Sequence, residues 1–129
     1  MSAATVLSFV MGAPLRPGVA IGHLALSSPD IKSTLAFFAL LDARSVFQTD
    51  GMAILEVRGG THLIVRAGEA ATVGFDLMVD DPDALRSLLI DEGYEPSPMR
   101  EGGVHRSFSV EDRAGVEHRL TSSHVVGPV

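Results

Sequence analysis

The chain has 129 residues, which suits one compact domain that buries roughly two-thirds of its unfolded surface. Its formal net charge of -6 argues against nucleic-acid binding, because that binding depends on basic residues that neutralise phosphates. The absence of cysteine excludes disulfides, thiolate metal sites and cysteine nucleophiles, and it is compatible with the cytoplasmic location that we expect.

Residues 1–18 are expected to form an arm that precedes the folded domain. The segment 4–11 is apolar but too short to span a bilayer of about 30 Å, and no basic residue precedes it. We therefore expect neither a signal peptide nor a membrane partner. The segment 12–18 contains two prolines and breaks regular structure. The arm is either flexible or packed outside the domain, or it adds a strand to a sheet edge.

Residues 19–66 predict a strand, a helix and three more strands. The first strand covers 20–27, Asp30 caps a helix over about 31–41, and Leu35, Phe38 and Leu41, with Phe37 beside them, form its apolar stripe. Strands are then expected over 44–49, 52–58 and 61–66. Asp50-Gly51 and Gly59-Gly60 separate these strands and are typical of two-residue hairpin turns.

Residues 73–122 repeat this order after a polar linker. A strand is predicted over 73–80, a helix over 82–92 that stops at Gly93, a proline-containing edge strand over 94–100, and strands over 104–111 and 116–121. Residues 123–129 form a tail. Because the plan occurs twice, the sequence predicts one α+β domain over 19–122, built from two βαβββ units that cover 19–66 and 73–122.

Strand alternation gives the predicted sheets an apolar face and a mixed face. The apolar face should lie under the helices, and it holds Leu24, Leu26, Leu55, Val57, Leu63, Val65, Phe75, Leu77, Val79, Phe108, Val110, Val116 and Leu120. The mixed face combines ionisable and aliphatic side chains, which suits a ligand pocket because unpaired buried charges are costly. Its candidate ligand-binding residues are His23, His62, Asp76, His105 and Arg119. The alternative is a solvated outer face.

The opening motif from Gly22 to Phe38 resembles that of the vicinal oxygen chelate superfamily. This group includes glyoxalase I, bleomycin-resistance proteins, fosfomycin-resistance enzymes and extradiol dioxygenases. The segment from Phe108 to Leu120 is similar to the final turn and strand of these proteins, and the resemblance covers about residues 19–122. It implies that each four-stranded unit curls into a half-barrel and that a ligand sits inside the combined curl.

The metal-dependent members of that superfamily place one ligand on the opening strand and one on the closing strand of each half. By this resemblance His23 takes the first position, and the others fall on Ile64, Gly74 and Arg119. The guanidinium of Arg119 would repel a divalent cation. It could instead clamp a carboxylate or phosphate, or pair internally with Asp76 or Glu117. His118 falls on the helix-facing side and is expected to be structural, as Asp112 is expected to form a turn.

Three function hypotheses follow. The first is a small-molecule-binding protein of the bleomycin-resistance type, which needs no metal and holds a ligand between His23, His62, His105 and Arg119. The second is a lyase or ring-cleaving dioxygenase that uses one divalent metal such as Zn, Fe, Mn or Ni on His23, His62 and Glu56, with Asp76 as the alternative carboxylate. The third is a structural or regulatory dimer without catalysis. A homodimer is expected in each case, and whether the chain is an enzyme stays open.

Overall fold

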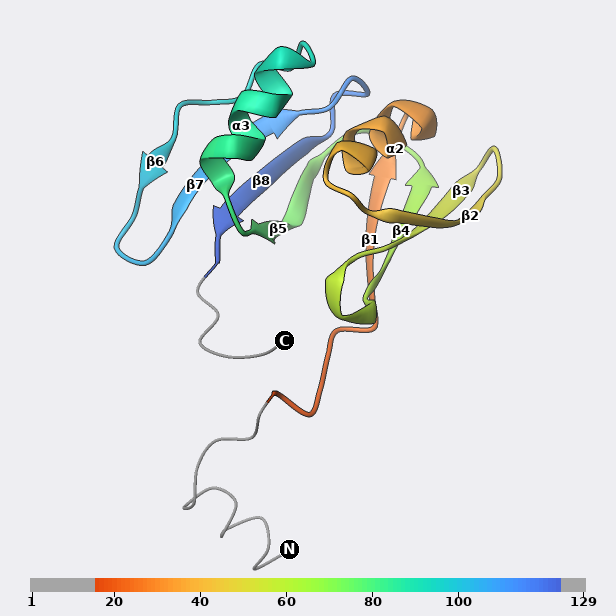
Figure 1. Ribbon diagram of the computed structural model, residues 1–129. Helices are drawn as coiled ribbons and strands as arrows, with labels where there is room; N and C mark the ends of the chain where they lie inside the picture. Colours follow the sequence, from red (N-terminus) through yellow and green to blue (C-terminus); the bar gives the residue numbers. More distant parts are fainter. Residues whose placement is uncertain (1–15, 124–129) are drawn as a thin grey trace, which may run out of the picture.

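The computed structural model describes residues 16–123, which form two βαβββ halves (Figure 1). The first half consists of β1 (His23–Ser28), α2 (Ile31–Leu40), β2 (Arg44–Gln48), β3 (Met52–Glu56), a 3-10 turn η1 (Arg58–Gly60) and β4 (His62–Ala67). The second half consists of β5 (Thr72–Val79), α3 (Pro82–Asp91), β6 (Arg100–Glu101), β7 (Arg106–Glu111) and β8 (Glu117–Ser122). The predicted α+β fold of two βαβββ repeats is confirmed.

Each half forms its own mixed sheet of four strands. The strand orders are β1-β4-β3-β2 and β5-β8-β7-β6, and the opening strand of each half pairs in parallel with the closing strand. The other neighbours are antiparallel. The opening strands β1 and β5 are therefore edge strands, and Figure 1 shows α2 lying against the first sheet and α3 against the second.

Both helices begin at an aspartate, as local sequence predicts for the first of them. Asp30 accepts hydrogen bonds from the backbone and the hydroxyl of Ser33, and Asp81 accepts one from the Ala84 N–H at 3.0 Å. These carboxylates satisfy N–H groups that have no partner within the helix. After α3 the chain turns at Gly93, whose φ of 91° confirms the expected left-handed stop.

The prediction of a strand over 94–100 is wrong for most of that segment, since β6 contains only Arg100 and Glu101. Pro96 and Pro98 have no N–H to donate to a neighbouring strand. Ser97 nevertheless holds the segment beside β7, because its N–H donates to the Ser109 carbonyl at 2.8 Å and its hydroxyl accepts from the Ser109 N–H at 2.9 Å.

The turn at Gly59 and Gly60 also differs from the predicted two-residue hairpin. Both glycines have φ of 83°, and the turn η1 is closed by a bond from the Val57 N–H to the Thr61 carbonyl.

The edge strand β1 starts at His23 rather than at the predicted residue 20. Residues just before it still touch β4, since the His62 N–H donates to the Gly22 carbonyl at 2.9 Å.

The predicted apolar face forms one core that extends through both halves. Residues such as Leu55, Leu63, Phe108 and Leu120 are buried, and those of the edge strand β5 are partly buried. Val57 is the one member of the predicted set outside this cluster of described residues. The side chains that point away from this core therefore form the mixed faces.

Helix α2 packs against both halves. Its buried residues are Ile31, Thr34, Phe37 and Phe38, whereas the predicted stripe residues Leu35 and Leu41 are only partly buried. The Phe37 ring stacks on His118 of β8 with a centroid distance of 4.3 Å. A helix of the first half thus covers part of the second sheet, which is why the two halves share one core.

A buried polar network lies beside this contact. The Asp112 carboxylate accepts from the Thr34 hydroxyl at 2.8 Å and pairs with His118 Nε2 at 3.0 Å. Its second oxygen accepts from the backbone N–H groups of Ala114 and Val116. His118 is therefore buried and structural in position, as predicted. Within residues 16–123, neither helix has the length and apolar character needed to cross a membrane.

Candidate ligand-binding site

Four ionisable side chains form one row across the mixed face of the first sheet. Glu56 lies opposite Arg44 and His62 on the neighbouring strands, and His62 lies opposite His23. Glu56 Oε2 is 3.0 Å from Arg44 Nη1, and Glu56 Oε1 is 3.1 Å from His62 Nε2. The His62 and His23 rings meet edge to face, with centroids 5.9 Å apart. We call this set the ionisable row.

An apolar row runs beside the ionisable row on the same face. Phe47 lies opposite Ile54, Ile54 opposite Ile64, and Ile64 opposite Ala25. Phe47 is 47% exposed, and the two isoleucines are half-buried. Residues two apart on a strand share a face, and the apolar row lies two residues along the strands from Glu56 and His62. The two rows are therefore adjacent on this face. The face therefore offers polar and apolar contacts side by side.

Arg44 and Phe47 belong to this face, although the sequence did not identify either as a candidate. They are three residues apart, so strict alternation would place them on opposite faces of β2. A β-bulge between Ser45 and Phe47 shifts the register by one residue and brings both to the mixed face. A signal for this bulge is absent from the local sequence pattern, since no glycine or proline marks it.

Asp76 and Arg119 lie opposite each other on the second sheet, and both are exposed. The predicted internal ion pair of Arg119 with Asp76 or Glu117 is not found among residues 16–123. Glu117 instead accepts a hydrogen bond from the Thr72 hydroxyl at 2.9 Å. The guanidinium of Arg119 thus has no ion-pair partner in the part of the chain that the structure describes.

His105 precedes β7 on the second sheet and is half-buried. Its Nδ1 lies 3.1 Å from the Ser122 carbonyl, so this nitrogen donates to the backbone of β8. The neighbouring Arg106 N–H donates to the Ser122 hydroxyl at 3.0 Å. These contacts fasten the start of β7 to the end of β8, which is a structural use of His105.

The structure brings only some of the candidate residues together. His23, Glu56 and His62 share the ionisable row, and Asp76 faces Arg119 on the other sheet. Within residues 16–123, no hydrogen bond, ion pair or ring contact joins one set to the other. A ligand that touched both sets would have to bridge the two sheets.

The metal positions that the superfamily resemblance implies fall on His23, Ile64, Gly74 and Arg119, of which His23 is of a residue type that commonly binds metals. Between residues 16 and 123 there is no group of three or more His, Cys, Asp or Glu side chains positioned to hold a metal ion. In the alternative set of His23, His62 and Glu56, each carboxylate oxygen already has a partner, one in Arg44 and one in His62. These contacts occupy His62 Nε2, whereas no contact of His62 Nδ1 is found among residues 16–123.

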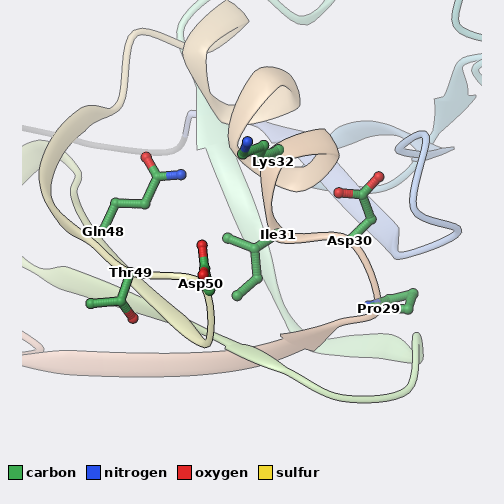
Figure 2. A pocket seen from close by; sticks show the side chains of 7 residues that line it. All are labelled: Pro29, Asp30, Ile31, Lys32, Gln48, Thr49 and Asp50. Atoms are coloured by element: carbon green, nitrogen blue, oxygen red, sulfur yellow. The ribbon is translucent and has the colours of Figure 1, made fainter.

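A separate pocket lies between the start of α2 and the end of β2. It has a volume of about 230 Å³ and is formed by Pro29–Lys32 at the start of α2 and Gln48–Asp50 at the end of β2 (Figure 2). Most of its lining is exposed, Ile31 being the buried member. Asp30 already caps the helix, which lowers the pKa of its carboxyl through the side-chain and backbone bonds to Ser33. The pocket contains none of the candidate residues.

Known structures share this architecture at low sequence identity. No protein-family model and no curated protein matches the chain. A lactoylglutathione lyase from Agrobacterium tumefaciens matches with a TM-score of 0.70 and 16% identity, over 86% of this chain and 98% of that chain. The fosfomycin resistance protein FosX from Listeria monocytogenes matches with a TM-score of 0.68 and 17% identity, over 82% and 92% of the two chains.

A third match is a bleomycin-binding protein from Streptomyces verticillus complexed with copper(II)-bleomycin. Its TM-score is 0.64 at 20% identity, over 84% of this chain and all 100% of that chain. These three proteins belong to one class by their fold, in which two βαβββ units are paired. The chain therefore has the vicinal oxygen chelate fold of glyoxalase, fosfomycin-resistance and bleomycin-binding proteins, as the resemblance implied. The fold alone does not fix the activity.

Proposed function

We propose that the protein binds a small molecule on the mixed faces of its sheets without needing a bound metal. The observation that carries this proposal is the pairing of the ionisable row with the apolar row. Glu56 and His62 are only 30% and 33% exposed, although they lie on the outer face of the sheet in a single chain. A face that combines oriented polar groups with partly exposed apolar side chains is typical of ligand sites.

Arg119 supports a second contact for the same ligand. Its exposed guanidinium has no ion-pair partner among residues 16–123, and it can bind a carboxylate or phosphate group through two parallel hydrogen bonds. Asp76 beside it would accept hydrogen bonds from donor groups. His105, at the start of β7 on the same sheet, is a further candidate contact.

A homodimer is part of this proposal. The mixed faces are open in the single chain, and β1 and β5 expose one edge of each sheet. A second copy that covered the mixed faces would enclose a ligand bound on them. Light scattering coupled to size-exclusion chromatography tests this, and a strictly monomeric protein at micromolar concentration would contradict it. A cytoplasmic location stays a prediction from composition.

Ligand screening tests the binding function directly. A stabilising ligand at about one hundred times its Kd raises the free energy of unfolding by about 2.7 kcal/mol, which thermal unfolding detects easily. Hits should be weakened by His23→Ala and by Arg119→Ala. The matched control is Arg58→Ala, which removes an exposed arginine of the turn η1 that pairs with Asp80 and belongs to neither row. A broad screen without any stabilising compound would favour a purely structural or regulatory dimer.

The second candidate function is a metal-dependent lyase or dioxygenase. The observation in its favour is that His23 and His62 are neighbours, with Glu56 beside them. A divalent ion would act there as a Lewis acid on substrate oxygens. Elemental analysis of untagged protein, purified without chelators, separates the two functions. Stoichiometric metal that disappears in His23→Ala would replace the first proposal with the second.

A further inference from the structure

Arg44, Glu56 and His62 form a chain of contacts that fixes the direction of one imidazole. Each oxygen of Glu56 has one partner, with Oε2 at 3.0 Å from Arg44 Nη1 and Oε1 at 3.1 Å from His62 Nε2. An ionised carboxylate only accepts hydrogen bonds, so Nε2 must carry the hydrogen in this contact. The neutral His62 ring then presents Nδ1 as an acceptor, and this atom has no partner among residues 16–123.

The apolar row defines what can lie beside this acceptor. Ile64 is two residues from His62, and Ile54 is two residues from Glu56, so both isoleucines follow the ionisable row along the same face. Phe47 extends that surface at the outer strand and is 47% exposed. A molecule that covers Ile54, Ile64 and Phe47 with an apolar body therefore brings its end group to His62.

The charges around His62 determine which kind of end group of a bound molecule is favoured there. One oxygen of the Glu56 carboxylate contacts the His62 imidazole, and the other oxygen contacts the guanidinium of Arg44. An anionic end group would face the lone pair of Nδ1 and the nearby carboxylate, both of which repel it. A neutral hydroxyl would instead donate its hydrogen to Nδ1.

We propose that His62 is a fixed hydrogen-bond acceptor, and that this site selects small molecules with an apolar or aromatic body and a neutral hydroxyl donor. Arg44 and Glu56 are positioning residues, because they act through His62. This inference rests on the proposed binding function and names the ligand class for the first sheet. It differs from the expected role of Arg119, which favours an anionic group on the second sheet.

Three matched probes test the proposal: para-tert-butylphenol, its methyl ether and para-tert-butylbenzoate. Each is titrated into the full-length protein at about pH 8, where unperturbed imidazoles are neutral, and binding is followed by NMR shifts of β3 and β4 amides. The phenol should bind about three- to tenfold more tightly than the ether, since the ether lacks the one hydrogen bond to His62. The benzoate should bind to these strands more weakly than the phenol.

Variants separate the acceptor from its positioning residues. His62→Phe keeps an aromatic ring but should abolish the preference for phenol over ether. Glu56→Gln and Arg44→Ala should reduce this preference, and nitrogen NMR of the His62 ring should change from one tautomer to a mixture. The matched control is Arg58→Ala, which also removes an exposed arginine paired to a carboxylate at 3.0 Å and should change neither readout.

Equal binding of phenol and ether, a preference that survives His62→Phe, or failure of all three probes would overturn this proposal. The general binding function would still stand if the broad ligand screen gave hits that depend on His23 and Arg119. The two failures are therefore distinguishable. A single Nε2–H tautomer of His62 that persists in both Glu56→Gln and Arg44→Ala would also contradict the assigned positioning roles.

Discussion

At the scale of single residues, Asp112 is the acceptor of a buried polar network. Its carboxylate accepts from His118, from the Thr34 hydroxyl and from two backbone N–H groups, and its side chain is fully buried. Asp112→Ala would leave His118 Nε2 and the two backbone N–H groups without this acceptor, and the Thr34 hydroxyl would keep only its contact with the Ser28 hydroxyl at 2.7 Å. We expect it to lower the free energy of unfolding by about 3–5 kcal/mol, which urea denaturation followed by circular dichroism would measure.

The matched control for this prediction is Asp80→Ala. Asp80 also pairs with a residue of the first half, Arg58, but its side chain is 74% exposed. Exposed ion pairs contribute about 1 kcal/mol or less. A loss as small for Asp112→Ala as for Asp80→Ala would mean that the buried network does not stabilise the fold.

The same residue predicts an acid-sensitive component of stability. Burial opposes ionisation of Asp112, but hydrogen bonds from His118, Thr34 and the Val116 backbone outweigh it and lower the pKa of the carboxyl below 3.8. A carboxyl group whose pKa is lower in the folded state than in the unfolded state contributes its full stabilisation at pH values above the unfolded-state pKa. This contribution is lost as the pH falls through the folded-state pKa. We expect the free energy of unfolding to decrease between about pH 5 and pH 2.

Asp112→Asn isolates this contribution, because Asp30 and Asp83 also have lowered pKa values and remain in the variant. Hydrogen bonds to Ser33 lower the first, and the hydrogen bond from Arg106 lowers the second. Denaturant titrations at several pH values should show wild type and variant converging toward acid. Parallel curves would contradict the assignment.

At the scale of elements, the sequence predicts most helices and strands and misses one local irregularity that matters. Helix starts at Asp30 and Asp81 and the stop at Gly93 follow from side-chain and backbone chemistry within a few residues. The bulge in β2 depends on how that strand pairs with β3. Pairing between strands is invisible in a local pattern, so Arg44 and Phe47 could not be assigned to the mixed face beforehand.

Gly93 gives a test at this scale. Its φ of 91° lies in the left-handed region, where a Cβ costs about 1–2 kcal/mol, although the nearest atom, on Arg113, would lie 3.7 Å away. We expect Gly93→Ala to destabilise the protein by about that amount in thermal or urea unfolding. Gly74→Ala is the control, because an added Cβ meets nothing within 4 Å there and its backbone needs no positive φ. Similar losses in the two variants would argue against backbone strain as the cause.

At the scale of the whole molecule, the position of the candidate site depends on how the two halves meet. Strand alternation is enough to place His23, Glu56 and His62 on one face, because all three lie on regular strands. It does not give the distance from that face to Arg119, since this depends on the packing of α2 across both sheets and on any second copy. The candidate residues on the mixed face of each sheet could therefore be predicted, but the position of one mixed face relative to the other could not.

The shared core predicts that the two halves unfold together. Phe37 is fully buried and contacts His118 and Tyr94 of the second half, so Phe37→Ala should cost about 3–5 kcal/mol and destabilise both halves at once. Phe47→Ala is the matched control: Phe47 is 47% exposed on the mixed face and should lose about 1 kcal/mol or less. Amide hydrogen exchange of β4 and β8 provides the measurement. If Phe37→Ala accelerated exchange in β4 alone, the halves would be independent folding units, and the packing of α2 against β8 would not couple them.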